Sequence, residues 1–256
     1  MLAKVEFPSI DEIVKWPNWF GSGPFGFNKI AFISFIAFIA PVIVFLIASS
    51  KYKSRLVPSG IQNVVESTVE FVEKQIILPT IGPDGMGYLP LLISMFVFIF
   101  IGNLFEILPT AHMPANARMA NPLILALITY VVFIGAGIKH NGLKFFKDAL
   151  FPPGVPKALY ILVTPIELIS TFLVRPFSLA VRLFANMLAG HILLLTFSVL
   201  TITLVGGGVF LKVVSPLSFF MLVAFTGSEF MVAFLQAYIF TLLTGVYIGG
   251  AIHPAH

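Results

Sequence analysis

The chain has 256 residues, of which 58% are hydrophobic and only 10% are charged, and it contains no cysteine. A typical soluble domain has about 25% charged residues, so this composition excludes a water-soluble enzyme, a nucleic-acid-binding module and a disulfide-stabilised secreted domain. Residues 159–256 contain only five charged side chains, too few to build a water-exposed surface. The composition is therefore that of a membrane protein, in which the net charge of +4 reflects basic loops on one side of the bilayer.

The N-terminal part of the chain predicts one membrane span after an exterior segment. Residues 1–29 are interrupted by proline and glycine, and we expect them to lie outside the membrane. The first continuous apolar run is 30–48, which at about 1.5 Å per residue can cross a hydrocarbon core about 30 Å thick. It follows the acidic residues Glu6, Asp11 and Glu12 rather than a short basic segment, and this order disfavours a cleaved signal peptide.

Residues 59–78 predict a helix that does not cross the membrane. Ser59 and Gln62 have the spacing of a capping box at a helix N-terminus. Apolar and polar side chains then alternate with helical periodicity, which is typical of an amphipathic helix lying in the membrane plane. The predicted apolar face consists of Ile61, Val64, Val65, Phe71, Val72 and Ile76, and the predicted polar face of Gln62, Asn63, Glu66, Glu70, Glu73 and Lys74.

The remaining apolar runs predict a helical hairpin and two longer helices. The hairpin occupies 88–138, in which two runs of spanning length are separated by a short link. The stretches 158–205 and 216–252 exceed the roughly 20 residues of a perpendicular span, and no polar turn divides either one. Within 158–252 we therefore expect two long, strongly tilted helices, joined at 205–214, with the first kinked by Pro176.

Taken together, these elements predict an all-α polytopic membrane protein with a single membrane domain. It has about five membrane-embedded helices and one in-plane amphipathic helix. The loops 51–87 and 139–158 hold eight Lys and Arg residues, so the positive-inside rule puts them in the cytoplasm, the N-terminus outside and the C-terminus in the cytoplasm. We expect a bacterial plasma (inner) membrane, with the mitochondrial inner membrane as the alternative.

The few charges within the long C-terminal helices are the candidate functional residues, because an ionisable group inside a membrane costs a few kcal/mol and is retained for function. Arg182 is a permanent cation. Asn186 and Arg175 lie on its helical face, with Glu167 near that face, whereas His191 is nine residues on, about 13 Å along the axis and on the opposite side. One helix would thus present a fixed cation to one side and a titratable group to the other, and could separate two aqueous pockets.

The second long helix carries Glu229 and Gln236, which are seven residues apart and share a face. Histidine and glutamate are natural members of a proton relay in a membrane. Structural interpretations compete: Arg182 could be an ion-pair partner of Glu229 or Glu167, and Arg175 could extend to the membrane interface. A rim position explains Glu106, at the end of its span, nearly as well as a place in the pathway.

Three segments resemble subunit a of the F-type ATP synthase, and the resemblance extends over nearly the whole chain. The strongest segment is 167–191, which contains Arg175-Pro176, Arg182-Leu183-Phe184 and Asn186; the others are 236–244 and 102–109. In that family, the arginine at the position of Arg182 faces the carboxylates of a rotating ring of c subunits.

The resemblance also implies roles for the other polar residues. Asn186, His191, Glu229 and Gln236 correspond to a half-channel open to the outside, whereas Glu167 and Arg175 border a half-channel toward the F1 side. The implied partners are the c-subunit ring, the b-subunit peripheral stalk, the F1 complex indirectly and membrane lipid, with no nucleic acid. The chain would be a non-catalytic proton-conducting subunit that binds no nucleotide, cofactor or metal.

Two other functions remain open on the sequence alone. A standalone ion channel or secondary transporter would use Arg182 and Glu229 as an intramembrane ion-pair site, although the chain has no internal repeat of the kind found in inverted-repeat transporters. A structural membrane scaffold would use the same polar residues only to hold helices together.

Overall fold

The structure is a computed structural model that describes residues 18–21, 26–52, 60–108, 116, 119–151, 156 and 159–253, with only the backbone of 48–52. Most of the predicted exterior segment, as well as Ser59 of the predicted capping box, lies outside these residues. Within them the fold is helical, and the only β pairing is an isolated bridge between Phe20 and Phe27. The prediction of an all-α protein is confirmed.

The helices follow one another with short breaks. They are α2 (Lys29–Tyr52), α3 (Ile61–Val72), the π-helical turn η1 (Glu73–Ile77), α4 (Leu78–Thr80), the 3-10 turn η2 (Pro83–Tyr88), α5 (Leu89–Ile107), α6 (Ala120–Asn141), α7 (Lys144–Leu150), α8 (Tyr160–Ile169), the π-helical turn η5 (Ser170–Val174), α9 (Arg175–Gly206) and α10 (Val209–Ile252). In the described part of the chain, five stretches are long and apolar enough to cross a membrane: Lys29–Ile47, Pro83–Ile107, Ala120–Asn141, Tyr160–Gly206 and Val209–Ile252.

The amphipathic helix differs in detail from its prediction. It begins at Ile61, after Gly60 with a φ of 61°. Val72 and Ile76 are buried as expected, but Ile61 and Val64 are exposed and Gln62 is buried, where its amide donates to Glu66. The cause is packing: α3 packs against both α2 and α5, so no single stripe of the helix faces the protein.

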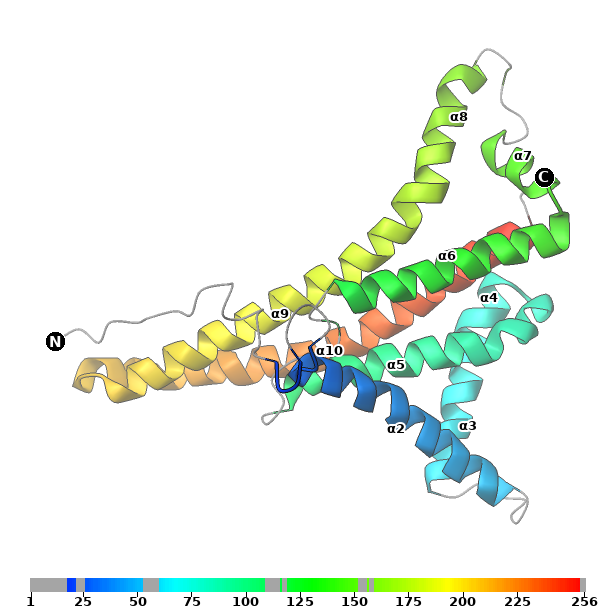
Figure 1. Cartoon of the computed structure of the whole chain (residues 1–256). Helices are drawn as coiled ribbons and strands as arrows, with labels where there is room; N and C mark the ends of the chain where they lie inside the picture. The colour runs from blue at the N-terminus through cyan, green and yellow to red at the C-terminus, as the bar shows by residue number, and fades with distance from the viewer. Residues whose placement is uncertain are drawn as a thin grey trace.

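The long helix through α8 and α9 bends where the sequence predicted a kink. The π turn η5 ends two residues before Pro176, which has no N–H to donate and whose ring conflicts with the preceding turn. Figure 1 shows α8 and α9 running in different directions on either side of this turn. The link to the last helix is shorter than predicted, because α9 continues to Gly206 and α10 already begins at Val209.

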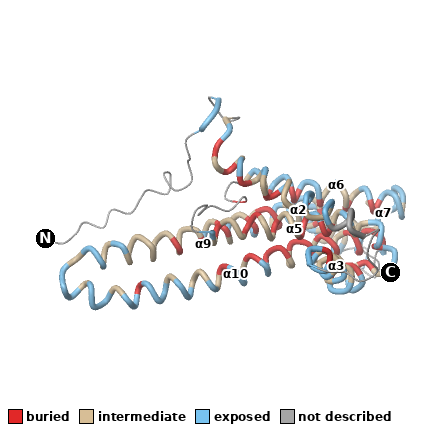
Figure 2. The backbone as a smooth tube through the Cα atoms, turned by 90° about the horizontal axis from the view of Figure 1, so that it is seen from below, coloured by how far each residue is buried: buried red, intermediate tan, exposed pale blue. Residues whose placement is uncertain are grey.

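The last two helices form an antiparallel pair whose connecting end extends away from the rest of the molecule (Figure 1). Helix α10 has 44 residues, so it is about 66 Å long, more than twice the thickness of a hydrocarbon core. It is therefore strongly tilted in a bilayer. Figure 2 shows buried residues concentrated toward the end where α10 meets α5 and α6, with mostly exposed and intermediate residues at the other end.

The core lies where α5, α9 and α10 meet the amphipathic segment, which consists of α3 and η1. It is formed by fully buried apolar side chains from all four, among them Ile76, Leu92, Ile99, Leu183 and Phe240. On the other side of α5, Ile30, Ile33 and Ala37 attach α2. Because α10 has neighbours on several sides here, the side chains on this part of the helix are held in place, and they include the polar groups of the candidate site.

Candidate functional site

Helix α9 presents Arg182 on a face that the rest of the described chain leaves open. Its buried residues recur every three or four positions, which is the spacing of one stripe along an α-helix: Leu179, Ala180, Leu183, Met187, Gly190 and Leu194. Arg182 lies off this stripe and is exposed, as are Ala185 and Ala189, three and seven residues further on. Among the described residues Arg182 forms no ion pair with Glu167 or Glu229. Its guanidinium is therefore accessible from outside this chain.

The buried stripe of α9 meets Glu229 of α10. The carboxyl group of Glu229 lies against Gly190, so closely that a methyl group on that glycine would be 2.6 Å from Glu229 Oε2. Glu229 is 8% exposed. His191 is the next residue along α9 and is half-buried. The structure thus brings Glu229 to the turn of α9 that carries His191, as a relay between the two would require.

A second buried carboxyl group lies near Glu229. Glu106 is on α5, is 2% exposed, and interacts electrostatically with Glu229. One turn earlier on α5, the Asn103 Oδ1 atom accepts a hydrogen bond of 2.8 Å from Asn116 Nδ2. Both asparagine side chains are fully buried. Helices α5, α9 and α10 therefore enclose a polar cluster within an apolar bundle.

Several atoms around this cluster lack a protein partner. Among the described residues, the buried polar atoms without a hydrogen bond include Asn103 Nδ2, Glu106 Oε1, Asn116 Oδ1, Glu229 Oε2 and Gln236 Nε2. A buried polar atom without a hydrogen bond costs about 1–3 kcal/mol, so such a concentration is typical of a functional site rather than of a structural core. Gln236 is 6% exposed and lies two turns from Glu229 on the same side of α10.

The polar residues near the start of α9 lie apart from this cluster. The Thr171 hydroxyl donates a long hydrogen bond of 3.5 Å to Glu167 Oε2. The Arg175 guanidinium lies over the ring of Tyr247 on α10, with its carbon 5.4 Å from the ring centroid. Arg175 is thus half-buried against α10, whereas Arg182 is exposed. Asn186, one turn after Arg182, is half-buried.

Sequence reasoning missed three residues of the site. Asn103 could have been identified from the sequence, since it precedes Glu106 by three residues and so shares its helical face. Gly190 adjoins His191, but only the fold reveals that its missing side chain makes room for Glu229. Asn116 lies in the sequence between the two apolar runs of the hairpin, and no helical periodicity could have placed it beside Asn103.

The polar cluster is distinct from an apolar cavity elsewhere in the molecule. Within the described residues, no group of three or more His, Asp or Glu side chains could hold a metal ion. A cavity of about 870 Å³ lies between α2, α5 and α6, and its lining is apolar apart from Ser94 and Asn121. None of the residues that line this cavity belongs to the polar cluster of α5, α9 and α10.

Comparison with known proteins identifies the family. The family model described as ATP synthase A chain matches residues 31–249. The chain is 41% identical over 252 residues to the ATP synthase subunit a of Frankia alni, covering 96% of this chain and 86% of that protein. It is 41% identical to the subunit a of Rhodococcus erythropolis, over 98% of this chain and 93% of that one, and 42% identical to the subunit a of Bartonella bacilliformis, over 92% and 91%. This multi-pass membrane chain therefore belongs to the ATP synthase subunit a family.

Proposed function

We propose that this chain conducts protons through two offset half-channels at its interface with a rotating ring of c subunits, and so couples a proton gradient to ATP synthesis by F1. Family membership supports the proton-translocating role and a complex with other ATP synthase subunits. One observation carries the finer proposal: α9 exposes a fixed cation on one face and receives a buried carboxyl group on another.

Arg182 is the group that meets the ring. Its face of α9 also carries Ala185 and Ala189, and small side chains let a neighbouring transmembrane helix approach closely. A guanidinium stays charged at any accessible pH, so it favours an ionised ring carboxylate as that carboxylate passes. The same positive charge repels protons, and therefore prevents a direct leak between the two half-channels.

The outside half-channel uses the polar cluster. Protons enter through Glu229 and His191, with Asn186 and Gln236 supplying hydrogen bonds without charge. We extend this path to Glu106, because its carboxyl group is buried and interacts with that of Glu229. The unpaired polar atoms around it suit a path in which water molecules or a moving proton complete the hydrogen bonds.

The inside half-channel begins near the bend before α9. Glu167 and Arg175 border it, and Ser170 and Ser178 are the nearby hydroxyl groups. A ring carboxylate that has turned through the lipid releases its proton here. Each charge that crosses a potential of 100 mV releases about 2.3 kcal/mol, and this free energy drives rotation.

The assembly follows from these roles. The ring of c subunits contacts α9, the b-subunit peripheral stalk prevents the chain from turning with the ring, and F1 is reached only indirectly. We place the chain in a bacterial plasma membrane, or in the mitochondrial inner membrane as the alternative, with the C-terminus on the F1 side. The C-terminal end of α10 contacts the C-terminal end of α6 and, through His253, also η2, and this arrangement supports the proposed topology.

Replacement of Arg182 tests the proposal. In the assembled complex in membrane vesicles, we expect Arg182→Ala to abolish ATP synthesis driven by an imposed proton gradient. Lys212→Ala is the matched control, because it removes an exposed cation near the connecting end of the same helix pair. Normal coupled synthesis by Arg182→Ala would refute the proposal, and proton conduction by the chain without c subunits would favour a standalone channel.

A further inference from the structure

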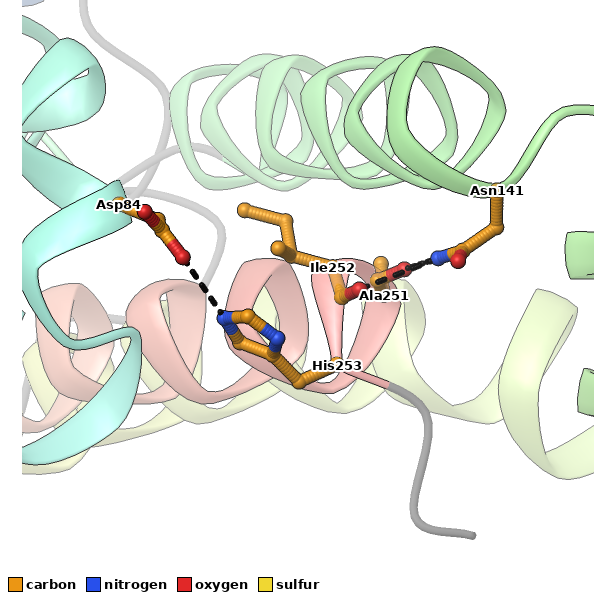
Figure 3. Close-up of polar contacts among 5 residues, drawn as sticks. All are labelled: Asp84, Asn141, Ala251, Ile252 and His253. Atoms are coloured by element: carbon orange, nitrogen blue, oxygen red, sulfur yellow. Dashed lines mark hydrogen bonds and ion pairs between the residues drawn. The ribbon is translucent and has the colours of Figure 1, made fainter.

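Two elements, α6 and η2, approach the C-terminal end of α10. The side-chain nitrogen of Asn141, the last residue of α6, donates to the backbone oxygens of Ala251 at 2.8 Å and Ile252 at 3.2 Å. Just beyond them, His253 Nε2 lies 3.3 Å from an oxygen of Asp84, which belongs to η2. Figure 3 shows the asparagine and the aspartate approaching the helix end from opposite sides.

The Asn141 bonds serve carbonyl groups that the helix itself leaves unpaired. The last four carbonyl groups of an α-helix have no intrahelical partner, and they carry the negative end of the helix dipole. Inside or near a membrane, such groups need a donor. The side-chain amide of Asn141 donates to two of these carbonyl groups. Asn141 is the last residue of α6, and Gly142, with a φ of 59°, ends that helix.

The same end of α10 is packed tightly against α4 and against an earlier part of α6. A methyl group on Gly249 would overlap the backbone carbonyl oxygen of Thr80, and one on Gly245 would lie 2.6 Å from the Thr80 hydroxyl oxygen. On another face, the hydroxyl groups of Thr244 and Thr129 are 3.2 Å apart. Sliding of α10 along its axis would break all of these contacts together.

We propose that Asn141 is a positioning residue for proton transfer: its amide fixes the axial position of α10, and thereby the height of Gln236 and Glu229 against α5 and α9. This inference rests on the proposed function of Glu229. Because α10 is one continuous helix from Val209 to Ile252, a shift at its end is carried to Glu229, about 35 Å away. The Asp84–His253 pair holds the end of α10 less firmly than Asn141 does, since both of its side chains are more than half exposed.

The test separates the amide donor from the shape of the side chain. Asn141→Asp keeps the size but replaces the donor with an oxygen that faces two carbonyl oxygens. In the assembled complex in vesicles, we expect ATP synthesis to slow about fivefold, and the outer-side proton concentration at half-maximal rate to change about threefold. Asn141→Gln, which keeps an amide donor, should restore most of the rate. Asn63→Asp, the same change at an exposed site on α3, should alter neither quantity.

A second measurement reports the helix position directly. The chain has no native cysteine, so a Thr129→Cys, Thr244→Cys pair forms a disulfide at a rate that depends on the register of α10 against α6. We expect Asn141→Asp to slow this reaction about fivefold. A Ser34→Cys, Asn121→Cys pair joins α2 to α6 without involving α10; the two side chains are hydrogen-bonded at 2.7 Å, and the pair should react unchanged.

Each outcome bears on the inference. Unchanged synthesis, pH dependence and disulfide rate in Asn141→Asp would overturn it, and so would an equal loss in Asn141→Gln, which would indicate packing alone. If Asn141→Asp does not assemble, Asn141→Ala removes the donor without adding charge and is judged in the same way. Normal synthesis in Arg182→Ala would instead refute the proposed function, whatever Asn141 does.

Discussion

The two halves of α10 are equally apolar but differ in what surrounds them. In the exposed half, residues 209–228, only Ser218 is buried, and Phe220 is 65% exposed. In the packed half, residues 229–252, Phe240 is 1% exposed and the buried polar groups Glu229 and Gln236 are held in place. A single helix thus combines a surface for lipid or partner chains with a rigid segment that carries the candidate proton path.

The cause of the difference is the number of neighbours. The exposed half packs chiefly against α9, whereas the packed half also contacts α5, α6 and the amphipathic segment. Close approach depends on small residues, and the tightly packed glycines of α10 lie in the packed half: Gly245 and Gly249 lie against Thr80, whereas Gly227 in the exposed half has open space. The comparison can therefore be tested by adding the same methyl group in each half.

The largest effect is expected at Gly249. Gly249→Ala places a methyl group on the Thr80 carbonyl oxygen, and because backbone cannot move aside as a side chain can, we expect a loss of about 3 kcal/mol in stability. The measurement is the fraction of the chain retained in the complex after heating. Gly250→Ala and Gly227→Ala, which meet no atom within 4 Å, are the controls. An equal loss in Gly227→Ala would contradict the division of α10.

An intermediate effect is expected where the packed half begins. In Gly190→Ala the new methyl group must displace the Glu229 carboxyl group, which is the flexible end of a side chain. The complex should therefore assemble normally, while proton-driven ATP synthesis falls about tenfold, because small misplacements of reacting groups are costly. Gly206→Ala on the same helix, with open space around it, is the control. Unchanged synthesis would mean that the position of Glu229 is not critical.

The difference between the two halves of α10 also shows which structural features the sequence can predict. The lengths of the apolar runs predict the helices, including the two long ones, because membrane thickness sets a fixed minimum for a span. They cannot separate Phe220 from Phe240, since lipid and protein interior are equally apolar and the pattern contains no contrast between them. Burial in such a chain is decided by tertiary neighbours.

Candidate polar residues are easier to choose from the sequence than buried apolar residues are, for the same physical reason. Arg182, Glu229 and Gln236 stand out against an apolar background, so they can be chosen as candidate functional residues without knowledge of the fold. Their partners were harder to predict: the approach of Glu229 to Gly190 depends on how two helices pack, and the Asn103–Asn116 hydrogen bond joins residues 13 positions apart, of which Asn116 lies outside the apolar runs.

The smallest effect is expected in the exposed half. Ser218→Ala removes the hydrogen bond with Thr201, and interhelical hydrogen bonds in membranes contribute about 0.6 kcal/mol on average, or roughly threefold in an opening equilibrium. Hydrogen exchange of the amides in residues 215–222 of the assembled complex should therefore accelerate about threefold. Exchange in residues 237–248 should not change, because the neighbours of the packed half hold it independently of the connecting end. Acceleration that extends into the packed half would show that the two halves open as one unit, and that the tight contacts near Thr80 do not isolate the proton path from motion at the exposed end.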